Sequence, residues 1–493
     1  MDTAFLSEAA FLRESFFMST FSSLFVRAGL RCRVSTLIIF CSITGLLHAQ
    51  VGSRSPGQRM PEVDRTALHA ALEAYDAGRA KVAESALVDL ARRYPGNYEA
   101  NETLGSLLAE AGDFTRAVPY LQKSCVLAPQ DAIAHANLGA AYLKAGDGKA
   151  AVGELERAAN LDPRNGVTQS NLGQALIMTK QPRAAAKAFA AAAAISPEDG
   201  ELVYNRSLAL FESGSAREAA ALLEGMPEAE KTDQVYELAG DAEERTGDYG
   251  KALANFQTAV QRNPSDANVY ALTAELLRHW TWPEAIEVAK FGTSRYPEST
   301  HFKMAEGIAY YGKSDYKSAV EVFSGLLSRA PDDAAVADLL GRSCSQLADG
   351  VDAGCDGMYE FAQRHPGNAV TTTYAAVAIL HEPKERQDLP KAASLLERAV
   401  AADPKYAEAY YQMGVLEQAR LQWAKSAAAL ERSIALRPES PEAHYRLSRA
   451  YSHLGRRDEA QAEIALNRTY SEQAKTHLDA KMQEVVRFLL KPS

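Results

Sequence analysis

The sequence predicts an all-α fold in which helical hairpins stack side by side into a solenoid. Small and apolar residues recur at a fixed period, and apolar residues at three- and four-residue spacing predict amphipathic helices. A constant period of this length is typical of repeat architectures, whose units bury their apolar faces against one another. The clearest marker is proline, in series with steps of 33 or 34 residues: Pro95, Pro129, Pro163 and Pro197; Pro264, Pro297 and Pro331; Pro404 and Pro438.

Each period is expected to hold two helices joined by a turn. Leu-Gly pairs, such as Leu138-Gly139, lie early in the first helix, where glycine lets the second helix approach closely. Gly-Asp pairs, such as Gly146-Asp147, lie at the turn. Glycine adopts a left-handed conformation at little cost, and aspartate can cap the helix that follows. Proline cannot continue a helix, so it marks the end of each unit.

This order of residues resembles the tetratricopeptide repeat (TPR): Leu-Gly in helix A, Gly-Asp at the turn, alanine and a large residue in helix B, then proline. The resemblance covers about residues 64–470 and implies a right-handed superhelix. It also implies a concave groove lined by the A helices, in which partner peptides lie. We expect about twelve units: units 1–5 at 64–232, units 6–8 at 233–333, irregular units 9–10 at 334–406, and units 11–12 at 407–470.

Several units depart from the pattern. The unit that starts at residue 200 is cut short at Met226-Pro227, and unit 9 carries three glycines in its second half. The segment 382–389 is an insertion between helices and is expected to be a solvated loop. Residues 471–493 are expected to form a separate capping helix and tail that covers the last apolar face. The apolar side chains expected to make this contact lie on one face of the helix: Leu478, Met482, Val485, Val486 and Leu489.

A pair of tryptophans marks the turn of one unit. Trp280 and Trp282 precede Pro283 in the sequence HWTWP. Exposed aromatic rings beside a turn can anchor a partner. Rings in a distorted repeat more often fold back and fill it, and both interpretations stay open at this point.

The N-terminus has the pattern of a targeting segment. Residues 34–47 form an uncharged apolar run that follows Arg27, Arg31 and Arg33. This is the order of a secretory signal, and the run is shorter than the roughly 20 residues of a spanning helix. We expect a signal peptide at 1–49, cleaved after Ala49, a flexible linker at 50–63, and a periplasmic or secreted protein. The alternatives are an uncleaved membrane anchor at 34–47 and a start at Met18 rather than Met1.

Composition excludes some classes of function. Hydrophobic residues make up 47% and charged residues 24%, which is typical of a folded protein. The net charge of −10 argues against nucleic acid as a partner, because nucleic acid requires a concentrated basic surface. Five cysteines are present without a CxxC pair, so zinc-finger and haem-attachment motifs are missing.

The sequence contains no motif for catalysis, a cofactor or a metal ion. His381-Glu382 is followed by Pro383, which excludes an HExxH helix, and neither a phosphate-binding nor a dinucleotide-binding glycine motif is present. The ten histidines are scattered, and single histidines are more often packing residues than ligands. We therefore predict a protein that is not an enzyme and has no cofactor, no metal site and no small-molecule substrate.

Three asparagines are the candidate peptide-binding residues. Asn137, Asn171 and Asn205 precede the Leu of three consecutive units at a spacing of 34. Each amide offers a donor and an acceptor to an extended peptide backbone. In some TPR proteins such a ladder binds peptides, although asparagine is also common at this position. The basic clamp of chaperone-binding TPR proteins is not expected, because Glu102, Ala136, Ser170 and Val167 occupy its places.

Two cysteines are candidates for a disulfide. Cys344 falls in the first helix and Cys355 in the second helix of irregular unit 9, so hairpin geometry can bring them together. An exported protein lies where disulfides form. Free buried thiols are the equally weighted alternative, and Cys125 has no evident partner.

The sequence thus predicts a non-enzymatic scaffold, exported to the cell envelope, that binds peptide segments or partner proteins in the groove of a TPR array. The alternatives are a membrane-tethered assembly factor and a non-catalytic accessory subunit of an enzyme complex. Partner identity and oligomeric state cannot be read from one sequence.

Overall fold

The computed structural model describes residues 58–347, 353–381 and 388–489, with side chains as far as Thr476. Within these ranges the chain forms helices joined by short turns, without a strand. The chain forms two compact units, and the boundary between them falls within one helix, between Asn255 and Phe256. The signal-peptide, anchor and start-site predictions lie outside the described residues, as does most of the 382–389 insertion.

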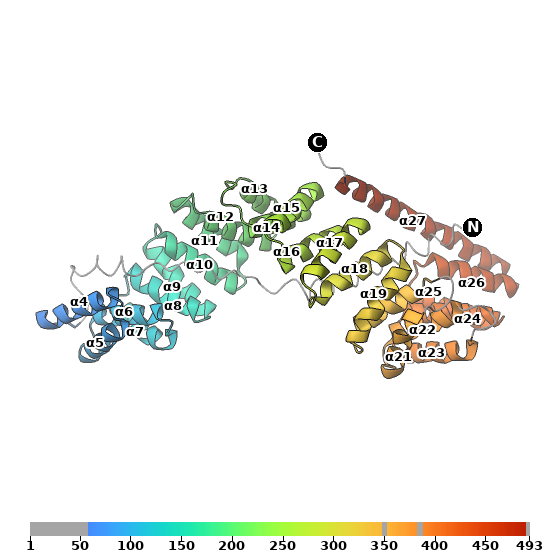
Figure 1. Cartoon of the computed structure of the whole chain (residues 1–493), viewed down its shortest axis with the longest axis horizontal. Coiled ribbons are helices and arrows are strands. Elements are labelled where there is room, and N and C mark those ends of the chain that lie inside the picture. Colours follow the sequence, from blue (N-terminus) through green and yellow to red (C-terminus); the bar gives the residue numbers. More distant parts are fainter. Residues whose placement is uncertain (1–57, 348–352, 382–387, 490–493) are drawn as a thin grey trace. The chain divides into compact units, whose positions relative to one another are not determined.

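The first compact unit is a row of antiparallel helix pairs, visible as stacked hairpins in Figure 1. Neighbouring helices along the chain contact each other, and A helices also contact the A helices of the next pair, as α6 does α8 and α8 does α10. The helices are α4 (Glu62–Asp76), α5 (Ala80–Arg93), α6 (Tyr98–Glu110), α7 (Phe114–Leu127), α8 (Ala132–Lys144), α9 (Gly148–Leu161), α10 (Gly166–Met178), α11 (Pro182–Ile195), α12 (Gly200–Glu212), α13 (Ala216–Glu224), α14 (Asp233–Thr246) and the first half of α15 (Tyr249–Arg262).

The second compact unit continues the same pattern of helix pairs. Its described helices are α16 (Asp266–Arg278), α17 (Trp282–Arg295), α18 (Thr300–Gly312), α19 (Tyr316–Arg329), α20 (Ala334–Cys344), the short 3-10 turn η2 (Ala353–Cys355), α21 (Asp356–Arg364), α22 (Ala369–His381), α23 (Leu389–Ala402), α24 (Ala407–Ala419), α25 (Trp423–Leu436), α26 (Pro441–His453) and α27 (Arg457–Leu489).

The turns form as the Gly-Asp pairs predict. Gly146 has φ 84°, and the Asp147 carboxylate accepts a hydrogen bond from the Ala150 N–H at the start of α9. The next residue with positive φ at this place is Lys180, one repeat later. The same left-handed turn therefore recurs whether or not the unit supplies glycine. The predicted capping by Asp is confirmed.

Close approach of the two helices in a hairpin depends on the glycine of the Leu-Gly pair. A Cβ added at Gly139 would lie 2.5 Å from Leu155 Cγ and 3.2 Å from the Leu155 backbone nitrogen. Gly173 faces the Phe189 ring in the same way, with contacts of 2.7 Å. Leu155 is fully buried by this packing. The prediction that these glycines permit close packing is confirmed.

Shortened second helices mark two irregular units. Helix α13 has 9 residues where α11 has 14, and it ends just before Met226-Pro227. In the irregular unit 9, α21 also has 9 residues. Pro227 after α13 and Gly354 just before α21 account for these lengths, because neither proline nor glycine favours a helix.

Two sequence predictions are corrected here. Residues 471–493 do not begin a separate capping helix, because α27 runs without a break from Arg457 to Leu489. This stretch contains neither glycine nor proline, so no turn interrupts it. The predicted linker 50–63 ends earlier than expected: the Gln58 N–H donates to the Gly96 carbonyl, Met60 is buried, and α4 begins at Glu62.

The two tryptophans of the HWTWP turn fill the structure. Trp280 is 9% exposed, with its ring stacked at 6.1 Å on that of Trp282. Trp282 lies against Gly312, where an added Cβ would be 2.8 Å from its ring. Trp280 also has φ 58°, which is unfavourable for a residue with a side chain. The partner-anchor interpretation is therefore not supported for Trp280.

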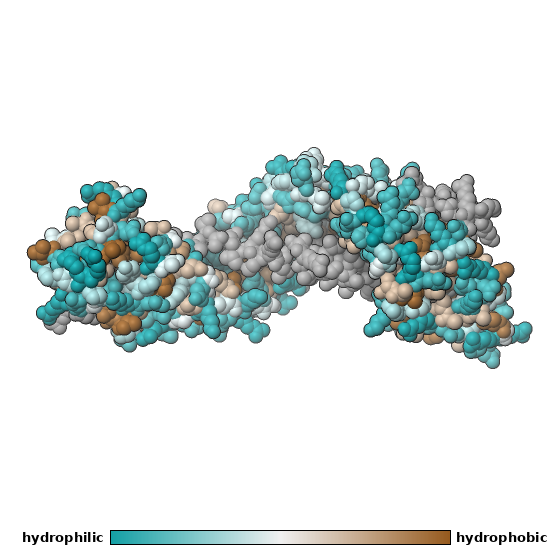
Figure 2. Space-filling model, turned by 90° about the horizontal axis from the view of Figure 1, so that it is seen from below, coloured by the Kyte–Doolittle hydropathy of each residue, from teal (hydrophilic) through white to brown (hydrophobic). Residues whose placement is uncertain are grey.

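No helix among the described residues is both long enough and apolar enough to cross a membrane. On the face drawn in Figure 2, hydrophilic residues predominate and exposed apolar residues form small, separate patches. The largest exposed fractions belong to single residues far apart in the chain, such as Val63 and Val126. Scattered apolar residues of this kind are usual on protein surfaces.

Cys344 and Cys355 are joined as a disulfide, with their Cα atoms 6.1 Å apart. Cys344 is the last residue of α20, and Cys355 lies in η2 rather than in the second helix. Both side chains are buried. The separation lies within the roughly 4.4–6.8 Å that a disulfide requires. Whether the bond forms in the cell stays a prediction.

We expect the purified protein to carry this disulfide and to lose about 3 kcal/mol of stability in the irregular unit on reduction, because the bond restricts the unfolded chain between two residues 11 positions apart. Non-reducing peptide mapping by mass spectrometry checks the bond, and hydrogen exchange over α20–α22 with and without reductant checks the stability. The double variant Cys344→Ser/Cys355→Ser is the control and should match the reduced protein. Free thiols in protein purified without reductant would contradict the prediction.

Candidate functional site

The first asparagine of the predicted ladder is tied into an internal network. Asn137 lies on α8 and is half-buried. Its Nδ2 donates to Glu102 Oε1 at 2.7 Å and lies 3.5 Å from Ser106 Oγ, both on α6. The amide nitrogen is therefore oriented toward the preceding A helix. This bond fixes which way the Asn137 amide faces.

The other two asparagines occupy the same place on the next two A helices. Asn171 on α10 and Asn205 on α12 are half-buried, like Asn137. Burial raises the pKa of Glu201, one turn earlier than Asn205 in the same helix. The hydrogen bond from Asn205 to the Glu201 carboxylate acts against this increase. In the part of the chain that the structure describes, the Asn171 side chain has no hydrogen-bonding partner. The three amides thus share one position but differ in their neighbours.

Glu102 is a buried carboxylic acid beneath this face. Its side chain is 5% exposed, and burial raises its pKa to about 7, against which the hydrogen bond from Asn137 acts. As the pH rises, the Glu102 carboxyl of the folded protein therefore keeps its proton to a higher pH than the same group in the unfolded chain. From the sequence, Glu102 serves only as evidence against the basic clamp of chaperone-binding TPR proteins. Its bond to Asn137 joins residues 35 positions apart, one repeat plus one residue.

We expect stability to fall between about pH 4.5 and pH 7 because of Glu102, since the pKa of this carboxyl is higher in the folded than in the unfolded state. The shift corresponds to about 3 kcal/mol. Glu102→Gln should remove this loss, so that the variant gains stability relative to wild type as the pH rises. Urea unfolding at pH 5 and pH 8 measures it. Glu156→Gln, on the exposed face of α9, is the control; equal pH profiles for Glu102→Gln and wild type would refute the prediction.

Acidic and aromatic side chains lie near Asn205, on α12 and on the next A helix, α14. Tyr204 on α12 is half-buried, and burial together with the carboxylates of Glu237, Asp241 and Asp233 raises its pKa to about 12. These carboxylates belong to α14. The A-helix face therefore becomes more acidic from α10 to α14.

Two small cavities accompany the irregular units. One of about 140 Å³ lies beside the shortened α13, with Leu223 and Val235 among its apolar walls and Lys251 at its rim. Another of about 50 Å³ lies among α20, α22, α24 and α26, where Arg437 pairs with Glu408 at 3.2 Å. Burial lowers the pKa of His381 in its wall. The sequence predicted neither cavity.

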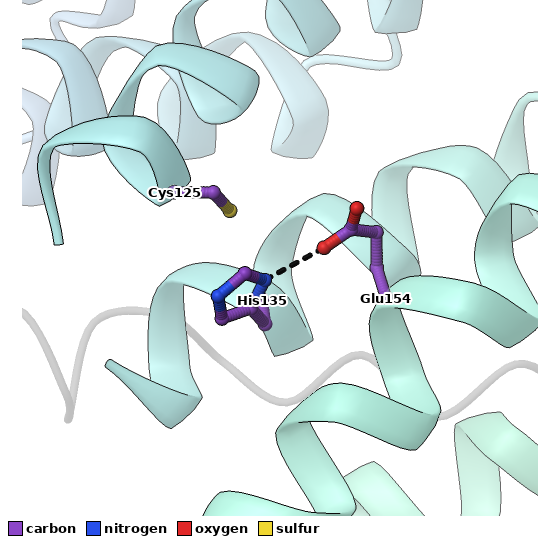
Figure 3. Close-up of side chains that lie close together, drawn as sticks. All are labelled: Cys125, His135 and Glu154. Atoms are coloured by element: carbon purple, nitrogen blue, oxygen red, sulfur yellow. Dashed lines mark hydrogen bonds and ion pairs between the residues drawn. The ribbon is translucent and has the colours of Figure 1, made fainter. Parts of the chain in front are cut away.

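Cys125, His135 and Glu154 form a cluster that sequence reasoning missed. They come from α7, α8 and α9 and point toward one another (Figure 3), with their ligand-type atoms all within 4.8 Å. His135 Nδ1 lies 2.6 Å from Glu154 Oε2, and its Nε2 lies 3.2 Å from the Pro129 carbonyl oxygen. Their separation along the chain hides the cluster, which only the alignment of successive helices reveals.

Comparison with known families supports the repeat directly. A model described as tetratricopeptide repeat matches residues 68–132, 170–232 and 238–280, and a second tetratricopeptide repeat model matches residues 416–466. No curated protein matches the chain. The matched segments fall in both compact units.

Solved structures with a similar arrangement are distant from this chain. Naa15/Naa10 bound to HypK-THB shares 14% identity over 82% of this chain and 68% of that one, with a TM-score of 0.36. Yeast Tom70 shares 14% identity over 78% and 96%, with a TM-score of 0.36. YrrB, described as a TPR protein with an unusual peptide-binding site, shares 22% identity over 38% and 97%, with a TM-score of 0.35.

Proposed function

The chain is a tetratricopeptide repeat protein, and we propose that it holds an extended segment of a partner protein on the A helices of units 3 to 5. Tetratricopeptide repeats are typical of non-catalytic scaffolds for protein interactions, which supports this general class of function. The observation that carries the specific proposal is the series Asn137, Asn171 and Asn205. Three half-buried amides occupy one position on the A helices of three consecutive units.

The spacing of these amides suits an extended peptide. Packed helices lie about 8–10 Å apart, and an extended chain rises about 3.3 Å per residue. Each asparagine would thus meet roughly every third residue of the segment. An amide can accept from a peptide N–H and donate to a peptide carbonyl. The Asn137 nitrogen donates to Glu102, so this residue is expected to offer its oxygen.

The charge of the neighbouring surface favours one orientation of partner. Beyond Asn205, Glu237 and Asp241 add negative charge near Tyr204. A segment with basic residues at that end would gain favourable electrostatic interactions, chiefly in association rate and specificity. This preference is testable by reversing the sequence of a peptide once the partner is known.

Variants of the ladder test the proposal. The first step is affinity purification of partners from cell-envelope extract with wild-type protein as bait, followed by calorimetric titration of the partner's segment. Asn171→Ala should weaken binding by about tenfold, because up to two hydrogen bonds of about 0.5–1.5 kcal/mol each are lost. Asn160→Ala is the matched control, since Asn160 is exposed on α9. Equal affinities for both variants and wild type would exclude the ladder as the binding site.

Export to the cell envelope is the second part of the proposal. It is supported by the apolar run at 34–47 after three arginines. A disulfide between Cys344 and Cys355, whose Cα atoms lie 6.1 Å apart, would be expected in an oxidising compartment. N-terminal sequencing of the mature protein from its native host should begin at Gln50. A retained N-terminus, together with extraction only by detergent, would indicate the membrane-tethered alternative instead.

A further inference from the structure

Among the residues that the structure describes, one arrangement of histidine, glutamate and proline occurs twice, once in each compact unit. His135 contacts the Pro129 carbonyl through Nε2 and the Glu154 carboxylate through Nδ1. His444 contacts the Pro438 carbonyl through Nε2 at 2.8 Å and the Glu463 carboxylate through Nδ1. Each proline precedes its histidine by six residues, and each glutamate follows by 19. We call this arrangement the His–Glu pair.

The short contact of the pair requires either a hydrogen or a metal ion between Nδ1 and the carboxylate oxygen. A carbonyl oxygen only accepts hydrogen bonds, so Nε2 carries the hydrogen that points at proline. In the neutral ring Nδ1 then bears a lone pair, and it faces a carboxylate oxygen at 2.6 Å in the His135 pair. Two acceptors approach this closely only when a proton or a metal ion lies between them.

The two pairs differ in their third neighbour. Cys125 stands ten residues before His135, and its Sγ lies within 4.8 Å of the other ligand-type atoms. Ile434 stands ten residues before His444. The His444 pair therefore has two ligand-type side chains at a place where the His135 pair has three. A metal site therefore depends on the third ligand-type side chain, Cys125, and not on the His–Glu contact alone.

We propose that Cys125, His135 and Glu154 bind a divalent transition-metal ion of the zinc class. Sγ, Nδ1 and a carboxylate oxygen would supply three ligands, and water would complete a tetrahedron. Thiolate, imidazole and carboxylate are the ligands that zinc takes in proteins, and three protein ligands with one water is a common set. The three side chains come from successive helices, so packing of the hairpins positions them (Figure 3).

The surroundings of His135 match those of metal-binding histidines. Such a histidine usually donates its other ring N–H to a carboxylate or a backbone carbonyl, which orients the ring. Here the Pro129 carbonyl accepts that bond and also accepts one from Arg157 at 3.1 Å. The His135 side chain is 3% exposed, whereas that of Glu154 is 31% exposed. The side of the cluster next to Glu154 is therefore open to an entering ion and to its water ligand.

Binding requires the Cys125 thiol to give up its hydrogen, because the thiolate is the form that binds a metal ion. The spacing of the other two ligand atoms must also change. Tetrahedral ligand atoms lie roughly 3.4 Å apart with bonds of zinc length. The Nδ1–Oε2 contact must therefore widen by somewhat less than about 1 Å, which the partly exposed Glu154 side chain can accommodate by a change of rotamer.

Cobalt titration of the full-length reduced protein tests the proposal. Co²⁺ should bind with one ion per chain, give a near-ultraviolet sulfur-to-cobalt charge-transfer band with visible bands of a tetrahedral ion, and be displaced by Zn²⁺. Cys125→Ser should abolish the near-ultraviolet band, and His135→Gln, which removes a ligand, should weaken binding by more than the roughly 10- to 100-fold typical of substitutions around a ligand. Glu463→Gln, in the pair without a cysteine, is the matched control and should bind as wild type does.

Circular dichroism of each variant establishes that it is folded before titration. A wild-type protein without the sulfur band, or an unchanged band in folded Cys125→Ser, would overturn the proposal. The first result would mean that the His135 cluster is a packing arrangement without a metal ion. The second would place the cobalt-binding thiol elsewhere, at Cys32, Cys41, Cys344 or Cys355.

Discussion

Replacing Gly139 by valine is expected to lower the stability of the α8–α9 hairpin by about 3 kcal/mol or more. Even the Cβ would lie 2.5 Å from Leu155 Cγ and 3.2 Å from the Leu155 nitrogen. The backbone contact prevents relief by a side-chain rotation alone, so the helices must move apart. Overpacking of this kind typically costs about 1–3 kcal/mol for smaller intrusions. Hydrogen exchange over residues 132–161 measures the local effect, because repeat arrays need not unfold in one step.

A second glycine in the same hairpin provides the matched control. Gly153 lies on α9 with no atom within 4 Å of an added Cβ. Valine and glycine differ by only a few tenths of a kcal/mol in helix propensity. Gly153→Val should therefore leave protection of the hairpin nearly unchanged. Similar losses for the two variants would mean that helix propensity, rather than close approach of α8 and α9, determines the effect.

Trp280→Gly is expected to destabilise the second compact unit by about 3 kcal/mol. Glycine relieves the positive φ of 58°, which costs about 1–2 kcal/mol for other residues. Loss of a buried tryptophan costs about 3–5 kcal/mol, and the more flexible unfolded chain adds up to about 1 kcal/mol. The burial term is the largest, because Trp280 is 9% exposed. Hydrogen exchange over α16–α18 provides the measurement.

Lys180→Gly separates the backbone effect from the burial effect. Lys180 has φ 57° at the corresponding turn of another repeat, and its side chain is exposed. Glycine relieves the strain of the positive φ without loss of packing, so Lys180→Gly should raise stability by up to about 1 kcal/mol. Opposite signs for the two variants are therefore expected. A stabilising Trp280→Gly would mean that the ring contributes little to packing.

The periodic parts of the fold were predictable from the sequence. Asp147 and Pro163 act through local backbone geometry, and Gly139 acts through close packing of the two helices in its hairpin; both effects recur with the 34-residue period. The boundary of α27 was not predicted correctly, because the unit pattern suggested a break that no glycine or proline provides. Periodicity is thus informative where a residue with a special conformation marks each boundary.

The candidate site was only partly predictable. The shared position of Asn137, Asn171 and Asn205 follows from the period, whereas their different hydrogen-bonding partners do not. The Asn137–Glu102 bond and the Cys125–His135–Glu154 cluster both join neighbouring helices. Such contacts depend on side-chain rotamers and helix packing, which the spacing of residues along one chain does not determine.

Photocrosslinking tests most directly the claim that the A helices of units 3 to 5 hold the partner. A benzophenone amino acid replaces Gln174, one turn beyond Asn171 on α10, or Lys187, exposed on helix B of the same unit, α11. After irradiation in cell-envelope extract, mass spectrometry identifies the crosslinked proteins. The account predicts that position 174 captures a partner segment and position 187 does not. Capture from position 187 alone, or equal capture of the same segment from both positions, would contradict it.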